Sequence, residues 1–140
     1  MAIIKTVVAV SNSQHLLDAY KKVFSHYPDY SLITTRNPND IDSQVKLASR
    51  QAEHINPSID LLITDLFVQR RRWLDLMREV REKSPHASLI VRLQQLDHPT
   101  AQRLRELKEE EKIYGICLVP SAVYEKNGDT LMARVKDLIG

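Results

Sequence analysis

The chain has 140 residues, of which 43% are hydrophobic and 27% charged, and its formal net charge is +2. These values fit a single domain, residues 1–140, with a hydrophobic core of its own. The net charge is too small to favour nucleic acid or a membrane surface as a partner. The single cysteine excludes a disulfide framework and a cysteine metal cluster. Together with the absence of a signal-peptide pattern at the N-terminus, it leads us to expect a cytoplasmic protein.

Five short segments rich in β-branched and aliphatic residues are predicted to be strands. They are nearly continuously apolar instead of alternating, which is typical of strands covered by helices on both faces. They span residues 4–10, 30–35, 59–67, 87–93 and 114–119.

Five further segments carry apolar residues at the spacing of one helix face. Ser13 is placed to cap the first helix, and Pro99 suits the first turn of the fourth. The apolar stripes comprise Leu16, Leu17, Tyr20, Val23 and Phe24; Ile41, Val45, Ala48, Ala52 and Ile55; Trp73, Leu76, Met77 and Val80; Ala101, Leu104 and Leu107; and Leu131, Met132, Val135, Leu138 and Ile139.

Strand and helix therefore alternate five times. This order predicts an α/β fold of three layers, with a parallel sheet, right-handed crossovers and helices on both faces. Five strands favour the flavodoxin-like order 2-1-3-4-5, in which ligands and chemistry lie at the carboxyl ends of the central strands. Three such ends are "VAVSNS" (8–13), "ITDLFVQ" (63–69) and "CLVPSA" (117–122).

The spacing of these strand ends resembles the receiver domain of two-component response regulators over essentially the whole chain. The clearest stretch is "IDLLITDLFVQRRRWLDLMREVREKSPHASLIV" (59–91), and "YGICLVPSAVYEKNGDTLMARVKDLI" (114–139) is similar to the end of a receiver. The resemblance implies a flavodoxin-like fold and a signalling module that is not an enzyme. It also implies that Asp65 stands at the position of the phosphoacceptor.

The other groups of a working receiver pocket are missing. In the family, two acidic residues help the phosphoacceptor hold Mg²⁺, and a hydroxyl and a lysine contact the phosphoryl oxygens. Here Ser11 and Asn12 stand at the acidic positions, Leu93 or Gln94 at the hydroxyl position, Val119 at the lysine position before the matching Pro120, and Ile116 at the aromatic position of the fifth strand. The pattern predicts a degenerate receiver, or pseudo-receiver, without a metal or another cofactor.

Asp65 has three interpretations: a strand-end carboxylate that bonds backbone amides or a nearby cation, a phosphoacceptor that still functions, or a ligand for something else. Arg92 interrupts the fourth strand. It either pairs with Asp65, replacing the lost lysine, or extends from the strand end to solvent.

The arginines 70–72 are expected to be solvated, with contact to an anion or an acidic partner as the alternative. Trp73 is expected to pack in the core or loop, with an interface anchor as the alternative.

Two functions of different classes follow. The first is a stand-alone pseudo-receiver that regulates by protein–protein interaction. The second is an atypical response regulator still phosphorylated on Asp65 in a two-component phosphorelay. A flavodoxin-like enzyme or ligand binder of another family is a third, weaker option, since fold alone does not set function.

The expected working surface is formed by the fourth helix, the fifth strand and the fifth helix, which receivers commonly use for partners or dimers. Its candidate interface residues are Arg103, Arg105, Glu106 and Ile116. Because the helix carries both signs of charge, a weak homodimer can form there through its own copy. The alternative is a solvated helix without a partner.

Overall fold

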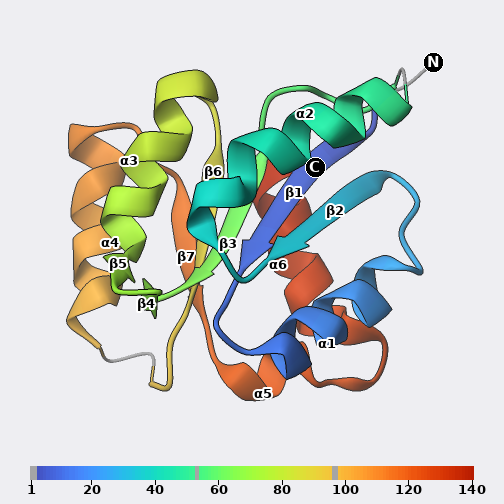
Figure 1. The fold of residues 1–140 in the computed structure, drawn as a ribbon. Helices are drawn as coiled ribbons and strands as arrows, with labels where there is room; N and C mark the ends of the chain where they lie inside the picture. The colour runs from blue at the N-terminus through green and yellow to red at the C-terminus, as the bar shows by residue number, and fades with distance from the viewer. Residues whose placement is uncertain (1–2, 53, 96–97) are drawn as a thin grey trace.

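The computed structural model describes residues 3–52, 54–95 and 98–140, and its centre is a parallel sheet of five strands (Figure 1). The strands lie in the order β2-β1-β3-β6-β7, which is 2-1-3-4-5 when only these five are counted. Their bounds are Lys5–Val10 (β1), Tyr30–Thr35 (β2), Leu61–Asp65 (β3), Ser88–Arg92 (β6) and Gly115–Leu118 (β7). The predicted fold class and strand order are therefore confirmed.

Helices cover both faces of the sheet, as the apolar strands require. On one face lie α2 (Ile41–Gln51), α3 (Trp73–Lys83) and α4 (Pro99–Glu110); on the other lie α1 (Gln14–Phe24), α5 (Pro120–Val123) and α6 (Asp129–Ile139). A separate cluster of buried apolar side chains fills each face. No helix in the described part of the chain has both the length and the hydrophobicity needed to cross a bilayer.

Local signals account for where several helices begin. Ser13 caps α1, because its Oγ accepts a hydrogen bond of 3.2 Å from the amide of Leu16. Pro99 is the first residue of α4, as predicted.

The buried stripe of α4 differs from the prediction: Thr100 is buried with Leu104 and Leu107, and Ala101 is only half-buried. Residues 100, 104 and 107 share one helix face, so Leu104 and Leu107 are buried as predicted and Thr100 takes the place expected for Ala101.

The second helix is shorter than predicted. Ala52, which the apolar stripe included, is extended and ends α2 after Gln51. Ile55 pairs with Ile4 in an isolated parallel bridge, and the amide of Ile4 donates to the carbonyl of His54 at 2.7 Å. Backbone hydrogen bonds to the start of the chain therefore replace a further helical turn.

A small hairpin follows β3 and was not predicted. It pairs β4 (Phe67–Val68) with β5 (Arg71–Arg72), so Phe67 belongs to the hairpin and not to the third strand of the sheet. The two turn residues, Gln69 and Arg70, have φ angles of 49° and 68°. Positive φ at both positions is the geometry of a type I′ turn, which usually takes asparagine or glycine. The sequence lacked that signal, and the short η1 (Pro38–Asp40) and η2 (Lys126–Gly128) turns were missed as well.

Candidate functional site

Asp65 and Arg92 are register partners at the carboxyl ends of β3 and β6. Leu61 and Ile63 of β3 pack against the face covered by α1 and α6. Because side chains alternate along a strand, Asp65 lies on this same face, and so does Arg92 two residues after Ile90. The register therefore brings a carboxylate and a guanidinium to one edge of the sheet.

Both oxygens of the Asp65 carboxylate have a partner. Arg92 Nε donates to Oδ1 at 2.7 Å, and Ser11 Oγ donates to Oδ2 at 2.6 Å. The side chains of Arg92 and Asp65 are only 18% and 15% exposed, and Ser11 is fully buried. Ser11 Oγ also accepts a hydrogen bond from the amide of Ser13, at 3.1 Å. The carboxylate is thus held by a charge-assisted bond on one side and a fixed hydroxyl on the other.

Burial and charge shift the ionisation of the groups around this pair. Burial disfavours the charge on Arg92, but the hydrogen bond and the attraction to Asp65 outweigh it and raise the pKa of the guanidinium. Burial raises the pKa of Tyr20 well above its usual value, and the nearby carboxylate of Asp65 raises it further. Tyr20 is 1% exposed and therefore remains a neutral phenol beside the ion pair.

Tyr20 was predicted as a core residue, and it does pack in the core of the α1–α6 face. Its electrostatic coupling to Asp65 and Arg92 was missed. A tyrosine within an aliphatic stripe carries a polar tip, which could have indicated a polar site at that end of the stripe. Tyr124, half-exposed after α5, also lies close enough to affect the ionisation of Arg92 and stacks on His15 with ring centroids 5.5 Å apart.

Asn12 follows Ser11 in the sequence, but its side chain forms hydrogen bonds with the backbone of the β4–β5 hairpin. Its Oδ1 accepts a hydrogen bond of 3.1 Å from the amide of Gln69, and its Nδ2 donates to the carbonyl of Phe67 at 3.4 Å. The residue at the second acidic position thereby fixes the loop that follows β3.

The remaining predicted pocket residues lie at different points of the fold. Leu93 is buried among the side chains of the opposite face, and its amide donates to the carbonyl of Leu118 at 2.8 Å. Gln94 is exposed. Val119 precedes α5 and is half-buried against the α1–α6 face, and Pro120 is the first residue of α5.

These residues do not fit a magnesium site of the receiver type. Mg²⁺ requires oxygen ligands in octahedral geometry, usually including carboxylates. Here Ser11 and Asn12 are neutral, and a guanidinium already lies 2.7 Å from Asp65. Across the described ranges, no group of three or more histidine, cysteine, aspartate or glutamate side chains is arranged to hold a metal ion.

The arginine run that follows Asp65 divides in two. Arg70 and Arg72 are exposed, as predicted for solvated charges. Arg71 departs from this prediction, because it forms an ion pair with Glu79 and donates to Asn39 Oδ1 at 3.0 Å. Trp73 is 6% exposed and packs in the core of the α2–α3–α4 face, which agrees with the predicted packing role.

The predicted interface residues on α4 bond mostly within their own helix. Arg103 Nη1 lies 3.2 Å from Glu106 and 3.3 Å from Glu110, and Arg105 donates to Gln102 at 2.9 Å. Ile116 of β7 is half-buried and packs against the α1–α6 face.

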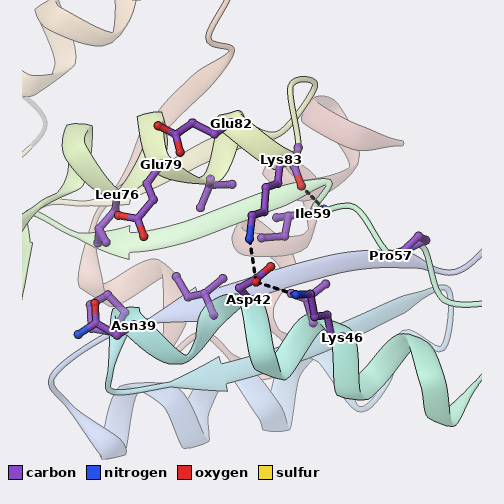
Figure 2. A pocket seen from close by; sticks show the side chains of 14 residues that line it. Asn39, Asp42, Lys46, Pro57, Ile59, Leu76, Glu79, Glu82 and Lys83 are labelled. Carbon is purple, nitrogen blue, oxygen red and sulfur yellow. Dashed lines mark hydrogen bonds and ion pairs between the residues drawn. The ribbon is translucent and has the colours of Figure 1, made fainter.

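A cavity of about 420 Å³ lies between α2 and α3, away from Asp65 (Figure 2). Its floor is apolar and includes Val45, Ile59 and Leu76. At its edge, Asp42 of α2 accepts hydrogen bonds from Lys83 of α3 at 2.8 Å and pairs with Lys46 at 3.2 Å. Hydrogen bonds from these two lysines lower the pKa of Asp42. The cavity lies on the opposite face of the sheet from Asp65, so the two are separate features.

Comparison with known proteins identifies the fold. No family model matches the sequence, and no curated protein matches it. Solved structures do match. The signal receiver domain of an HD domain-containing protein from Pseudomonas fluorescens Pf-5 is 16% identical with a TM-score of 0.64, over 99% of this chain and 89% of that one. A response regulator receiver domain protein from Clostridium thermocellum is 16% identical with a TM-score of 0.60, over 96% of this chain and 94% of that one.

A third match comes from the crystal structure of the P1 domain of CheA3 in complex with CheY6 from R. sphaeroides. It is 16% identical with a TM-score of 0.64 and covers 98% of each chain. At such identities the likeness concerns the fold alone. The chain has the receiver (CheY-like) fold, a flavodoxin-like arrangement of sheet and helices.

Proposed function

We propose that this chain is a receiver-like signalling module, a single domain over residues 1–140, that acts by binding other proteins. It does not undergo Mg²⁺-dependent phosphorylation on Asp65 and performs no catalysis of its own. The observation that carries the proposal is the hydrogen bond of 2.7 Å that Arg92 Nε donates to Asp65 Oδ1.

The charges around the carboxylate of Asp65 oppose phosphorylation. A carboxylate that accepts a phosphoryl group needs a free oxygen as nucleophile and cations to offset the charge on the transferred group. Both oxygens of Asp65 are engaged, and the guanidinium of Arg92 stays charged at any physiological pH. Arg92 therefore places a positive charge beside the carboxylate where a receiver would use a metal, and it repels a divalent cation.

A second function is an atypical response regulator that is still phosphorylated on Asp65. One observation favours it: Arg92 and Ser11 are donors beside the carboxylate, and arginine binds phosphoryl oxygens well. In this alternative Arg92 would release Asp65 and bind the phosphoryl group. The absence of acidic residues at positions 11 and 12 weighs against it, because it removes two carboxylate ligands for Mg²⁺.

The proposed partner is another signalling protein. The matched structure of CheA3 with CheY6 supports the class of partner, since it is a complex between signalling proteins. We infer that the predicted surface of the fourth helix, fifth strand and fifth helix, which is α4, β7 and α6 in the structure, contributes to partner binding. Arg105 and Glu106 are exposed on α4, and Tyr114 is 47% exposed before β7. A weak homodimer through this surface belongs to the same proposal.

The proposal is tested by titrating the protein with millimolar Mg²⁺ and beryllium fluoride while recording backbone amide NMR spectra. We expect no saturable shifts at Ser11, Asn12 and Asp65. Arg92→Thr serves as the matched variant, since it frees one carboxylate oxygen but adds no carboxylate. Saturable shifts in the unmodified chain that disappear in Asp65→Asn would support the phosphorylated alternative.

A further inference from the structure

A groove of about 340 Å³ lies between the β4–β5 hairpin and the first turns of α4. Figure 1 shows this hairpin and the beginning of α4 at the same end of the molecule. Phe67, Trp73 and Pro99 contribute apolar surface to it. Its ionisable lining side chains, among the described residues, are Arg72, Arg103 and His98, so every one is basic.

The composition of this groove resembles that of protein-recognition sites. Phe67 is 56% exposed beside the groove, whereas Trp73 is 6% exposed. A single exposed aromatic residue is ordinary, but tryptophan and arginine next to an apolar hollow are the residue types that dominate binding hot spots. Because the charged side chains that line it among the described residues, Arg72 and Arg103, are cationic, the complementary occupant carries negative charge.

The hairpin that forms one wall is held in place before any partner arrives. The carbonyl of Leu66 accepts from the amide of Trp73 at 2.9 Å, and Asn12 accepts from the amide of Gln69 at 3.1 Å. Gln69 Nε2 donates to the carbonyl of Arg36 at 2.7 Å. These bonds hold the two turn residues with positive φ, a conformation that persists only when its surroundings fix it. A wall that is already ordered loses little conformational entropy on binding.

We propose that this groove binds an acidic peptide segment of a partner protein that contains a large apolar residue. The apolar side chain enters beside Phe67 and Trp73, and carboxylates on either side of it pair with Arg72 and Arg103. The ion pairs of Arg103 with Glu106 and Glu110, at 3.2 and 3.3 Å, are exposed, so exchanging them for a partner's carboxylate costs little. The inference rests on the proposed function, protein recognition, and adds a site and the chemistry of the occupant.

Trp73 provides the measurement, because it is the only tryptophan of the chain and lines the groove. Its fluorescence is followed during titration with acetyl-Glu-Glu-Leu-Phe-Glu-Glu-amide. Two further peptides are compared: one with glutamine in place of every glutamate, and one with serine in place of leucine and phenylalanine. We expect saturable binding of the first peptide and roughly tenfold weaker binding of the other two, as expected for the loss of a few exposed charge pairs or of the apolar anchor.

Variants locate the binding. Arg72→Glu and Phe67→Ser are expected to weaken the first peptide by about tenfold or more, the change that removing one hot-spot contact produces. Two matched controls lie outside the groove lining: Arg70→Glu, in the turn of the hairpin, and Arg105→Glu, on α4. Neither should change the affinity for the first peptide much. Circular dichroism and thermal unfolding confirm that each variant is folded.

Several results would overturn the inference: no saturable signal, equal binding of the glutamine peptide, or equal effects of Arg70→Glu and Arg72→Glu. Loss of binding in Arg105→Glu alone would also overturn it, because binding would then occur on the surface of α4, β7 and α6. None of these results bears on phosphorylation of Asp65, so the groove can fail while the proposed function stands. Phosphorylation of Asp65, conversely, would contradict the proposed function without affecting peptide binding.

Discussion

Arg92 and Asp65 lie side by side in register on β6 and β3, and Arg92 Nε donates a hydrogen bond of 2.7 Å to Asp65 Oδ1. The cation comes from the fourth strand of the sheet and its position is set by the backbone ladder, so it does not depend on a mobile loop. Both side chains are largely buried, which makes the pair stronger than an exposed one and makes each partner depend on the other.

Replacing only one residue of the Arg92–Asp65 pair should therefore lower the free energy of unfolding more than replacing both. We expect Arg92→Met to lower the free energy of unfolding by about 1–3 kcal/mol, less than for a fully buried pair because water still reaches the edge of the sheet. Adding Asp65→Asn to this variant should restore part of the loss. Urea unfolding of the two single variants and the double variant measures the coupling energy. Additive effects, within about 0.5 kcal/mol, would mean that the pair contributes little.

Restoring a hydroxyl after β6 should lower the stability strongly at one position and hardly at all at the next. Leu93 is 1% exposed in the core of the α2–α3–α4 face, so Leu93→Thr removes apolar contacts and buries a hydroxyl there. We expect this variant to lose about 2–4 kcal/mol of stability. Gln94→Thr, at an exposed position, should change stability by less than about 0.5 kcal/mol. Equal effects in thermal unfolding would contradict the described facing of the strand.

Tyr20 should make the fold sensitive to alkaline pH. Burial raises its pKa in the folded chain above the ordinary value of 10.0, so the stability it contributes is fully present below about pH 10 and is lost as pH rises toward the folded pKa. The loss from one such group approaches about 1.4 kcal/mol per pH unit. Tyr20→Phe should flatten this decline. The pKa of Tyr30 is raised by burial too, but that contribution remains in the variant, so the difference between the chains isolates Tyr20. Parallel stability curves above pH 10 would show that Tyr20 does not ionise on unfolding.

The surface of α4, β7 and α6 should support only weak self-association. Arg103 pairs with Glu106 and Glu110 on its own helix in exposed ion pairs, and exchanging one exposed pair for another between two copies gains little free energy. We expect a dimer that forms at high protein concentration and low salt and dissociates as ionic strength rises. Arg103→Glu combined with Arg105→Glu should remove it. Sedimentation measures the mass. A chain that is monomeric at high concentration and low salt would leave only a different protein as the partner of this surface.

Much of the fold could be predicted because its signals are local and repeated. The apolar strands and the helical stripes predict the sheet order without any knowledge of contacts. The end of α2 could not be predicted in this way, because Ile55 lies at helical spacing but pairs with Ile4 from a distant part of the chain. The hairpin was missed because Gln69 and Arg70 adopt positive φ without the asparagine or glycine that usually reveals such a turn.

The candidate site could be predicted only in part. The position of Asp65 follows from the end of an apolar run, and its pairing with Arg92 was one of two options for that arginine. The choice between them depends on register and on strand facing, which the sequence does not contain. For the same reason, the placement of Leu93 on the opposite face and the contact of Asn12 with the hairpin required the structure.

The most direct test of the proposal that Asp65 is not phosphorylated is the intact mass of the protein after incubation with acetyl phosphate and Mg²⁺. The reaction is run on the unmodified chain, on Asp65→Asn and on Arg92→Thr, with a functional receiver domain as the positive control. We expect all three chains to keep their original mass while the control gains one phosphoryl group. A phosphoryl adduct on the unmodified chain that is absent from Asp65→Asn would contradict it.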